Sequence, residues 1–305
     1  MNAVTLDDGG CDAWGAAVAA WCTSKGIACR RGVVRSGAVP DGEGAVVICK
    51  GAAAAADRAF VPPWARGRVE RLVLIDECPL WQASGRNVHC EWEDPSCGAR
   101  AMVSRGSWSH AGKDWSPPDP ARLRGLIDEL GLTLKPWRNA VEDGPVLVFS
   151  RNPGGFWYLG GSGDPLRRWI EEDDARMSRA ASELGRPVQL RLHPRTSPGA
   201  RSARVRAGMP PGCALQPERE PLAKALSRAA FVDVGAGGSC VIAALEGVPS
   251  VPWAGSERSQ IDAGGFSPLE RETRLAVIAA HSVSLSELRC GEFDLFRTRS
   301  GPPTG

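Results

Sequence analysis

Short apolar runs alternate with longer segments of mixed polarity along most of this chain. In the first half, runs rich in β-branched and aliphatic residues predict strands at 3–6, 28–31, 46–49 and 72–75, with an alanine-rich helix at 14–24. In the second half, strands are predicted at 146–149, 188–192, 214–215, 231–234 and 250–252, separated by helices at 164–184, 220–229 and 239–246. Strands that alternate with helices in this way indicate parallel sheets with right-handed crossovers, so we expect an α/β fold.

The proline-rich segment Trp115-Ser116-Pro117-Pro118-Asp119-Pro120 marks a domain boundary, and a length of 305 residues suits two domains of about 150 residues each. We expect an N-terminal domain at 1–118, a linker helix and connector at 119–144, and a second domain at 145–268. The remaining residues, 269–305, form a tail that we predict to be helical from 269 to 288.

A glycine-rich turn follows the apolar run Phe231-Val232-Asp233-Val234. Gly235, Gly237 and Gly238 permit close approach of the backbone to a ligand, and Ser239 is a suitable N-cap for the helix that follows. A helix N-terminus at the carboxyl end of a strand favours anions, so a phosphate is the expected ligand. The same turn is also common in doubly wound domains without a ligand.

A second polar element follows the strand at 188–192, where the sequence reads His193-Pro194-Arg195. In a parallel sheet this element and the glycine turn lie at the same carboxyl edge, and both can face one pyrophosphate. Arg151 comes directly after the strand at 146–149 and is a third candidate for that edge. The alternatives are a structural histidine that bonds a loop carbonyl, and a surface arginine.

Together, these motifs resemble the GT-B class of nucleotide-sugar glycosyltransferases, in particular small glycosyltransferase-like proteins of bacteriophages. The resemblance is carried by Leu-Lys-Pro-Trp-Arg at 134–138, Pro-Val-Leu-Val-Phe at 145–149, Arg-Leu-His-Pro-Arg at 191–195, Gly-Gly-Ser with Ala-Ala-Leu-Glu-Gly-Val-Pro downstream, and the pattern at 279–291. It implies two Rossmann-like domains that face each other across a cleft, with the nucleotide sugar on the C-terminal domain and the acceptor on the N-terminal one.

The resemblance assigns donor phosphate to His193, Arg195 and Ser239. From their positions in the sequence, the amides of Gly237 and Gly238 and the guanidinium of Arg151 are further candidates for the same phosphate. Glu246 is either the ribose contact or a solvated helix end. Cationic side chains and a helix N-terminus can stabilise the leaving pyrophosphate alone, so no cofactor is required and no divalent metal is expected at a fixed site. The co-substrate is expected to be a UDP-sugar.

An acceptor hydroxyl needs a general base, and the candidates lie in the N-terminal half. Asp76 and Glu77 follow a strand directly, and His110, Asp7 and Asp8 compete with them. Three tryptophans, Trp81, Trp92 and Trp108, are candidates for stacking on the acceptor. Each acidic residue could instead cap a helix or lie in a solvated loop, and the acidic run at 171–174 is interpreted as a solvated helix face.

Four hypotheses for function follow. The phage-like resemblance favours transfer to a 5-hydroxymethylpyrimidine of double-stranded DNA, where the tryptophans would stack on a flipped base. A surface or capsular glycan is the rival acceptor. A nucleotide-sugar epimerase and a non-catalytic nucleotide or nucleic-acid binding module of GT-B shape are the other two.

The composition indicates the class of protein and the compartment in which it works. The chain is 43% hydrophobic and 24% charged with a formal net charge of +2, as expected for a globular protein. Ten cysteines lie apart without a C-x-x-C pair, which is typical of a reducing compartment. Because an apolar stretch of about 18 residues and a signal-peptide pattern are both missing, we expect no membrane insertion and a cytoplasmic location, in the host cytoplasm if the chain is phage-encoded.

Overall fold

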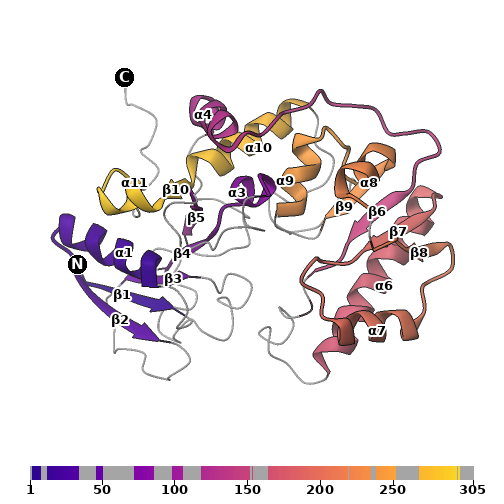
Figure 1. Cartoon of the computed structure of the whole chain (residues 1–305), viewed down its shortest axis with the longest axis horizontal. Helices are drawn as coiled ribbons and strands as arrows, with labels where there is room; N and C mark the ends of the chain where they lie inside the picture. Colours follow the sequence, from indigo (N-terminus) through magenta and orange to yellow (C-terminus); the bar gives the residue numbers. More distant parts are fainter. Residues whose placement is uncertain are drawn as a thin grey trace. The chain divides into compact units, whose positions relative to one another are not determined.

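The chain divides into two compact units in the computed structural model (Figure 1). The first unit comprises Met1–Gly131 and Thr273–Gly305, and the second comprises Leu132–Glu272. The tail from Thr273 onward and the helix after the proline-rich segment therefore belong to the first unit. The residues described are 2–7, 12–33, 46–50, 72–85, 98–105, 118–151, 153, 164–218, 220–234, 238–251, 268–293 and 295.

The first unit is built on a mixed sheet whose strands lie in the order β10-β5-β4-β3-β1-β2. The four predicted strands pair in parallel, as the alternating pattern indicated. Two further strands, which the sequence did not predict, are antiparallel: β5 pairs with β4, and β10 pairs with β5. The strands are β1 (Asn2–Asp7), β2 (Ala28–Val33), β3 (Val46–Lys50), β4 (Leu72–Glu77), β5 (Arg100–Arg105) and β10 (Ser282–Ser284).

The tail is not one helix, and the prediction of a helix over 269–288 was wrong in its middle. Helix α10 (Pro268–Ala280) ends one residue before His281, and the chain then extends as β10 before α11 (Leu285–Arg289) begins. His281 is bound to Val103 of β5 through its backbone and its side chain. Its carbonyl accepts from the amide of Val103 at 3.0 Å, and its Nδ1 lies 2.8 Å from the Val103 carbonyl oxygen. Ser284 and Glu287 then form a capping box that starts α11.

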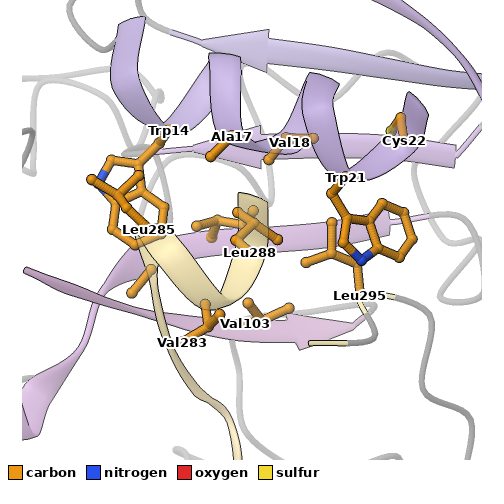
Figure 2. Close-up of a cluster of buried hydrophobic side chains, with 12 residues drawn as sticks. Trp14, Ala17, Val18, Trp21, Cys22, Val103, Val283, Leu285, Leu288 and Leu295 are labelled. Carbon is orange, nitrogen blue, oxygen red and sulfur yellow. The ribbon is translucent and has the colours of Figure 1, made fainter. Parts of the chain in front are cut away.

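The core of the first unit joins the two ends of the chain. Helix α1 (Asp12–Ser24) buries Trp14, Ala17, Val18 and Trp21, which share one face at helical spacing. Leu285 and Leu288 of α11 pack into the same cluster, as Figure 2 shows. The Trp21 indole also donates to the carbonyl of Phe293 at 2.6 Å, so the tail completes this core.

Two arginines and two glutamates hold the tail in place. Arg100 of β5 donates to both carboxylate oxygens of Glu129 at 3.1 and 2.6 Å, and to Glu287 of α11 at 3.0 Å. Arg122 reaches the other oxygen of Glu287 at 2.7 Å. Glu129 and Arg122 lie on α4 (Pro120–Leu130), and the remaining helix described here is α3 (Pro79–Ala83). The pairing is expected to be strong because Arg100 is only 7% exposed.

The second unit has a purely parallel sheet with strand order β8-β7-β6-β9. The predicted strand at 250–252 is reduced to a single parallel bridge between Ser250 and Val232. Helix α7 was not predicted. The strands are β6 (Val146–Phe149), β7 (Val188–Arg191), β8 (Cys213–Leu215) and β9 (Phe231–Val234). The helices are α6 (Pro165–Leu184), α7 (Pro198–Ala207), α8 (Leu222–Arg228) and α9 (Gly238–Leu245).

The connector before β6 is bound to the ends of two helices of this unit. The amide of Lys135 donates to the Leu245 carbonyl at 2.8 Å, at the end of α9. The Arg138 guanidinium donates to three carbonyls at the end of α8, of which those of Ser227 and Ala229 lie at 2.8 and 2.9 Å. These contacts satisfy carbonyls that a helix end leaves without partners.

Gly247 allows a close approach to this connector, and a test follows from it. Its φ is +69°, and a Cβ there would lie 2.2 Å from the carbonyl oxygen of Pro136. Gly185 has a similar φ of +60°, but a Cβ added there would have no atom within 4 Å. We predict that Gly185→Ala lowers the free energy of unfolding by about 1 kcal/mol, and that Gly247→Ala lowers it by about 3 kcal/mol or more. Urea unfolding measures both, and equal losses would contradict the packing role of Gly247.

Candidate functional site

The second sheet has a topological switch point between β6 and β9. From β6 the chain proceeds outward through β7 to β8, and it then returns to place β9 on the opposite side of β6. In open α/β sheets, ligands bind in the crevice at the carboxyl ends of the strands at such a point. The candidate site is therefore the edge beyond Phe149 and Val234.

Five of the six described donor residues predicted from the sequence lie at this edge, and the sixth, Glu246, lies at the other end of α9. Arg151 is two residues beyond the end of β6, and His193 and Arg195 follow β7, its parallel neighbour. Gly238 and Ser239 lie in the first turn of α9, directly beyond β9. Ser239 was predicted as the N-cap, but the helix begins at Gly238, so the serine is the second helical residue. Gly237 lies outside the described residues.

A tight turn holds His193. Its Nδ1 accepts a hydrogen bond from the amide of Arg195 at 3.1 Å, and its carbonyl accepts from the amide of Thr196 at 2.9 Å. Burial, together with the charge of Arg195, lowers the pKa of His193 to about 4. The ring is therefore neutral at pH 7, and because Nδ1 accepts, the proton lies on Nε2. A neutral imidazole of this tautomer can donate one hydrogen bond to an oxygen.

Thr196 belongs to the same turn, and sequence reasoning missed it. It is only 8% exposed, and its Oγ1 has no hydrogen-bond partner within the described part of the chain. A buried hydroxyl in this state calls for an explanation, and a ligand oxygen is one. The available signal was its place one residue after Arg195.

Two other predicted donor residues already have partners. Nε of Arg151 lies 3.3 Å from Oε1 of Glu172 on α6. Glu246 follows the last residue of α9, and its Oε2 accepts from Nζ of Lys135 at 2.5 Å. Because Lys135 is part of the connector, this ion pair gives Glu246 a structural contact, whereas a ribose contact stays a prediction.

A buried polar cluster lies directly beneath the candidate edge. Asp173 of α6 is 1% exposed, so the prediction of a solvated face for the acidic run was wrong at this residue. Its Oδ2 accepts from the Ser150 hydroxyl at 2.6 Å, and the Trp169 indole donates to the same hydroxyl at 2.8 Å. Burial raises the pKa of Asp173 to about 6, although the Ser150 hydrogen bond and the Arg176 charge oppose that rise.

Arg176 extends the cluster across the switch point. Its guanidinium donates to the carbonyl of Phe149 at 2.8 Å, to the carbonyl of Asp233 at 2.9 Å and to the Asp233 carboxylate at 3.0 Å. Phe149 is the last residue of β6, and Asp233 is the penultimate residue of β9. One side chain from α6 thus binds the carboxyl ends of both strands that flank the site.

In the first unit, the predicted acceptor residues are only partly located. Asp76 and Glu77 are the last two residues of β4, at the carboxyl edge as expected. The switch point of the parallel strands lies between β1 and β3, and Asp7, a competing candidate, ends β1. The other two candidate bases, Asp8 and His110, and the other two tryptophans, Trp92 and Trp108, lie outside the described residues.

Trp81 does not fit its predicted role. It lies on α3 and is 0% exposed, so its ring has no free face on which an acceptor could stack. The physical reason is the large apolar area of the indole, which the fold uses for packing.

Among the described residues, no group of three or more His, Cys, Asp or Glu side chains could hold a metal ion. None of the described helices combines the length and the apolar character needed to cross a membrane.

No protein-family model matches the sequence, and no curated protein matches it. Among solved structures, the chain is similar to KpsC from Thermosulfurimonas dismutans, a beta Kdo 2,4 transferase, with a TM-score of 0.40 and 12% sequence identity over 92% of this chain and 91% of that chain. At a TM-score below 0.5, this likeness carries no argument about the site or its chemistry.

The state of His193 predicts how stability depends on pH. Its folded pKa of about 4 lies below the ordinary value of 6.5, so the unfolded chain takes up the proton first as the pH falls. The free energy of unfolding should therefore decrease from pH 6.5 to pH 4, by about 3 kcal/mol for this residue alone. Urea unfolding of the wild type and His193→Gln checks this, and an equally steep decline in both proteins would contradict it.

Proposed function

We propose that this protein is a glycosyltransferase that binds a nucleotide sugar at the carboxyl edge of the second sheet. The observation that supports it is the convergence of three separate segments on the β6/β9 switch point. These segments are Arg151 after β6, the turn from His193 to Thr196 after β7, and the first turn of α9 after β9. Each offers cations or hydrogen-bond donors, as a pyrophosphate requires.

The chemistry of the leaving group follows from those donors. Charge that develops on the departing nucleotide is stabilised by Arg195, by the amides in the first turn of α9, which have no acceptor within the helix itself, and by the Nε2 proton of His193. Because His193 is neutral at pH 7, it acts as a hydrogen-bond donor and adds no charge of its own. Thr196 offers a hydroxyl to the same phosphate group.

For the acceptor side we propose a carboxylate base at the carboxyl edge of the first sheet. Asp76, Glu77 and Asp7 are the candidates, with Asp7 nearest to that sheet's own switch point. The base would remove the proton of the acceptor hydroxyl as the hydroxyl oxygen attacks the sugar. Hydroxymethylpyrimidine in DNA and a surface or capsular glycan are the two proposed acceptors, and the donor is proposed to be a UDP-sugar.

Nucleotide binding tests the donor site first. We expect calorimetry to show UDP binding by the wild type, and His193→Ala and Arg195→Ala each to weaken it about tenfold, as the loss of one charge-assisted or buried contact does. Arg206→Ala is the matched control, because Arg206 is exposed in the last turn of α7 and lies away from this edge. If the control variant weakened UDP binding as much as Arg195→Ala, the donor site would be wrongly placed. The affinities for GDP, ADP and CMP, measured in the same way, identify the nucleobase that the site prefers.

Turnover tests the transfer step. With a panel of nucleotide sugars, nucleotide release should require an acceptor, supplied as hydroxymethylated DNA or as a polysaccharide. Among Asp76→Asn, Glu77→Gln and Asp7→Asn, one variant should lose about 100-fold or more in kcat while it keeps its affinity for UDP. Binding without turnover on either acceptor would favour the non-catalytic module, and a change of the sugar without transfer would favour epimerisation.

A further inference from the structure

Helix α6 holds Ser150 and Arg151 at the end of β6 through several contacts. The Trp169 indole donates to the Ser150 hydroxyl at 2.8 Å and lies 3.1 Å from the carbonyl oxygen of Arg151. The Ser150 hydroxyl donates in turn to Asp173 at 2.6 Å. The backbone at the start of the site is therefore bound to the inner face of α6.

The Arg151 side chain is held by the same helix. Oε1 of Glu172, the neighbour of Asp173, lies 3.3 Å from Nε of Arg151, and the two side chains are 23% and 33% exposed. Backbone and guanidinium are thus both bound to α6, within a short stretch of that helix. The side chain cannot change its position without breaking one of these contacts.

Asp173 is an unusual residue for simple packing. A carboxylate that is 1% exposed loses its hydration, and an apolar residue would fill the same space at lower cost. The charged groups that face it are Arg176, whose Nη1 lies 3.9 Å from Oδ1, Glu172 on the same helix, and Arg204 on α7. Asp233 of β9 binds Arg176 from the other side.

We infer that Asp173 and Ser150 are positioning residues for Arg151, and that the ionisation state of Asp173 sets how tightly a phosphate group is held at the end of β6. This inference rests on the proposed function for the identity of the ligand. When Asp173 is ionised, the Ser150 proton points to its Oδ2. When Asp173 is protonated, it donates to the Ser150 oxygen, and the Ser150 proton turns to the Arg151 carbonyl oxygen, 3.2 Å away.

The direction of the pH effect follows from charge. A bound pyrophosphate brings negative charge towards Asp173, so it favours the protonated carboxyl, and by reciprocity the protonated carboxyl favours the ligand. Because burial raises the pKa of Asp173 to about 6, the change falls between pH 5 and 7. His193, with a pKa of about 4, remains predominantly neutral over that interval.

UDP-glucose is the probe, because its pyrophosphate diester stays fully ionised over this range. Wild-type affinity should be about fivefold higher at pH 5 than at pH 7.5. Asp173→Asn, which copies the protonated carboxyl because it is neutral and its amide can donate to Ser150, should bind with the higher affinity at both pH values. Ser150→Ala should bind about tenfold more weakly, because the hydrogen bond that ties the end of β6 to Asp173 of α6 is lost and Arg151 is held less firmly.

Asp174→Asn is the matched control. Asp174 is the next residue of α6, and its Oδ1 pairs with Nη1 of the fully buried Arg204 at 2.7 Å. The change should lower the urea midpoint while it leaves the affinity and pH profile of UDP-glucose binding at wild-type values. A role that is only structural predicts instead that affinity follows stability across the variants, and that result would overturn the inference.

A second measurement needs no ligand. The backbone amide ¹⁵N resonance of Arg151 should titrate with a midpoint near pH 6 in the wild type and in Asp174→Asn. The titration should disappear in Asp173→Asn and lose more than half its amplitude in Ser150→Ala. If the resonance titrates as described but UDP-glucose does not bind, the positioning role stands and the proposed function fails. A resonance that does not titrate, or titrates equally in Asp173→Asn, overturns the positioning role.

Discussion

The arrangement of the second unit depends on one guanidinium. Arg176 donates from all three of its nitrogens, and the acceptors are the carbonyls of Phe149 and Asp233 and the carboxylate of Asp233. These acceptors lie on two parallel strands that are neighbours in space but more than 80 residues apart in sequence, counted from Phe149 to Asp233. The planar fork of arginine can satisfy such a set, whereas a lysine ammonium cannot match its geometry. Asp233 supplies the countercharge that a guanidinium needs where only 10% of its side chain is exposed.

This contact also explains why the site can be built from loops. The carboxyl ends of β6 and β9 are held at a fixed spacing from below, so the segments that follow them start from defined positions. Asp173 and His193 then differ in a useful way. Burial disfavours the charged form in both, which raises the pKa of the acid and lowers that of the base. At pH 7 the imidazole of His193 at the edge is accordingly neutral, and the buried carboxylate of Asp173 is about one pH unit above its pKa.

Some of the residues that carried the family resemblance make contacts that hold the fold together, and these contacts lie away from the candidate site. Within Leu-Lys-Pro-Trp-Arg, Lys135 pairs with Glu246, and Arg138 binds the end of α8. The guanidinium carbon of Arg271 lies over the ring of Trp137, 5.5 Å from the ring centroid. These contacts hold the connector in place, and they give these residues no part in chemistry.

The sequence alone determined most of the strands and helices, because apolar runs between glycines and prolines specify local structure. The strands at 146–149 and 231–234 were placed without error for this reason. It did not reveal β5, whose apolar run is short between two arginines, or α7, whose buried positions are Ala200 and Arg204. Nor did it show that Asp173 is buried or that Trp81 has no exposed face. Tertiary structure decided these points, because burial of a polar group depends on partners such as Ser150 and Arg176 that only the folded chain brings together.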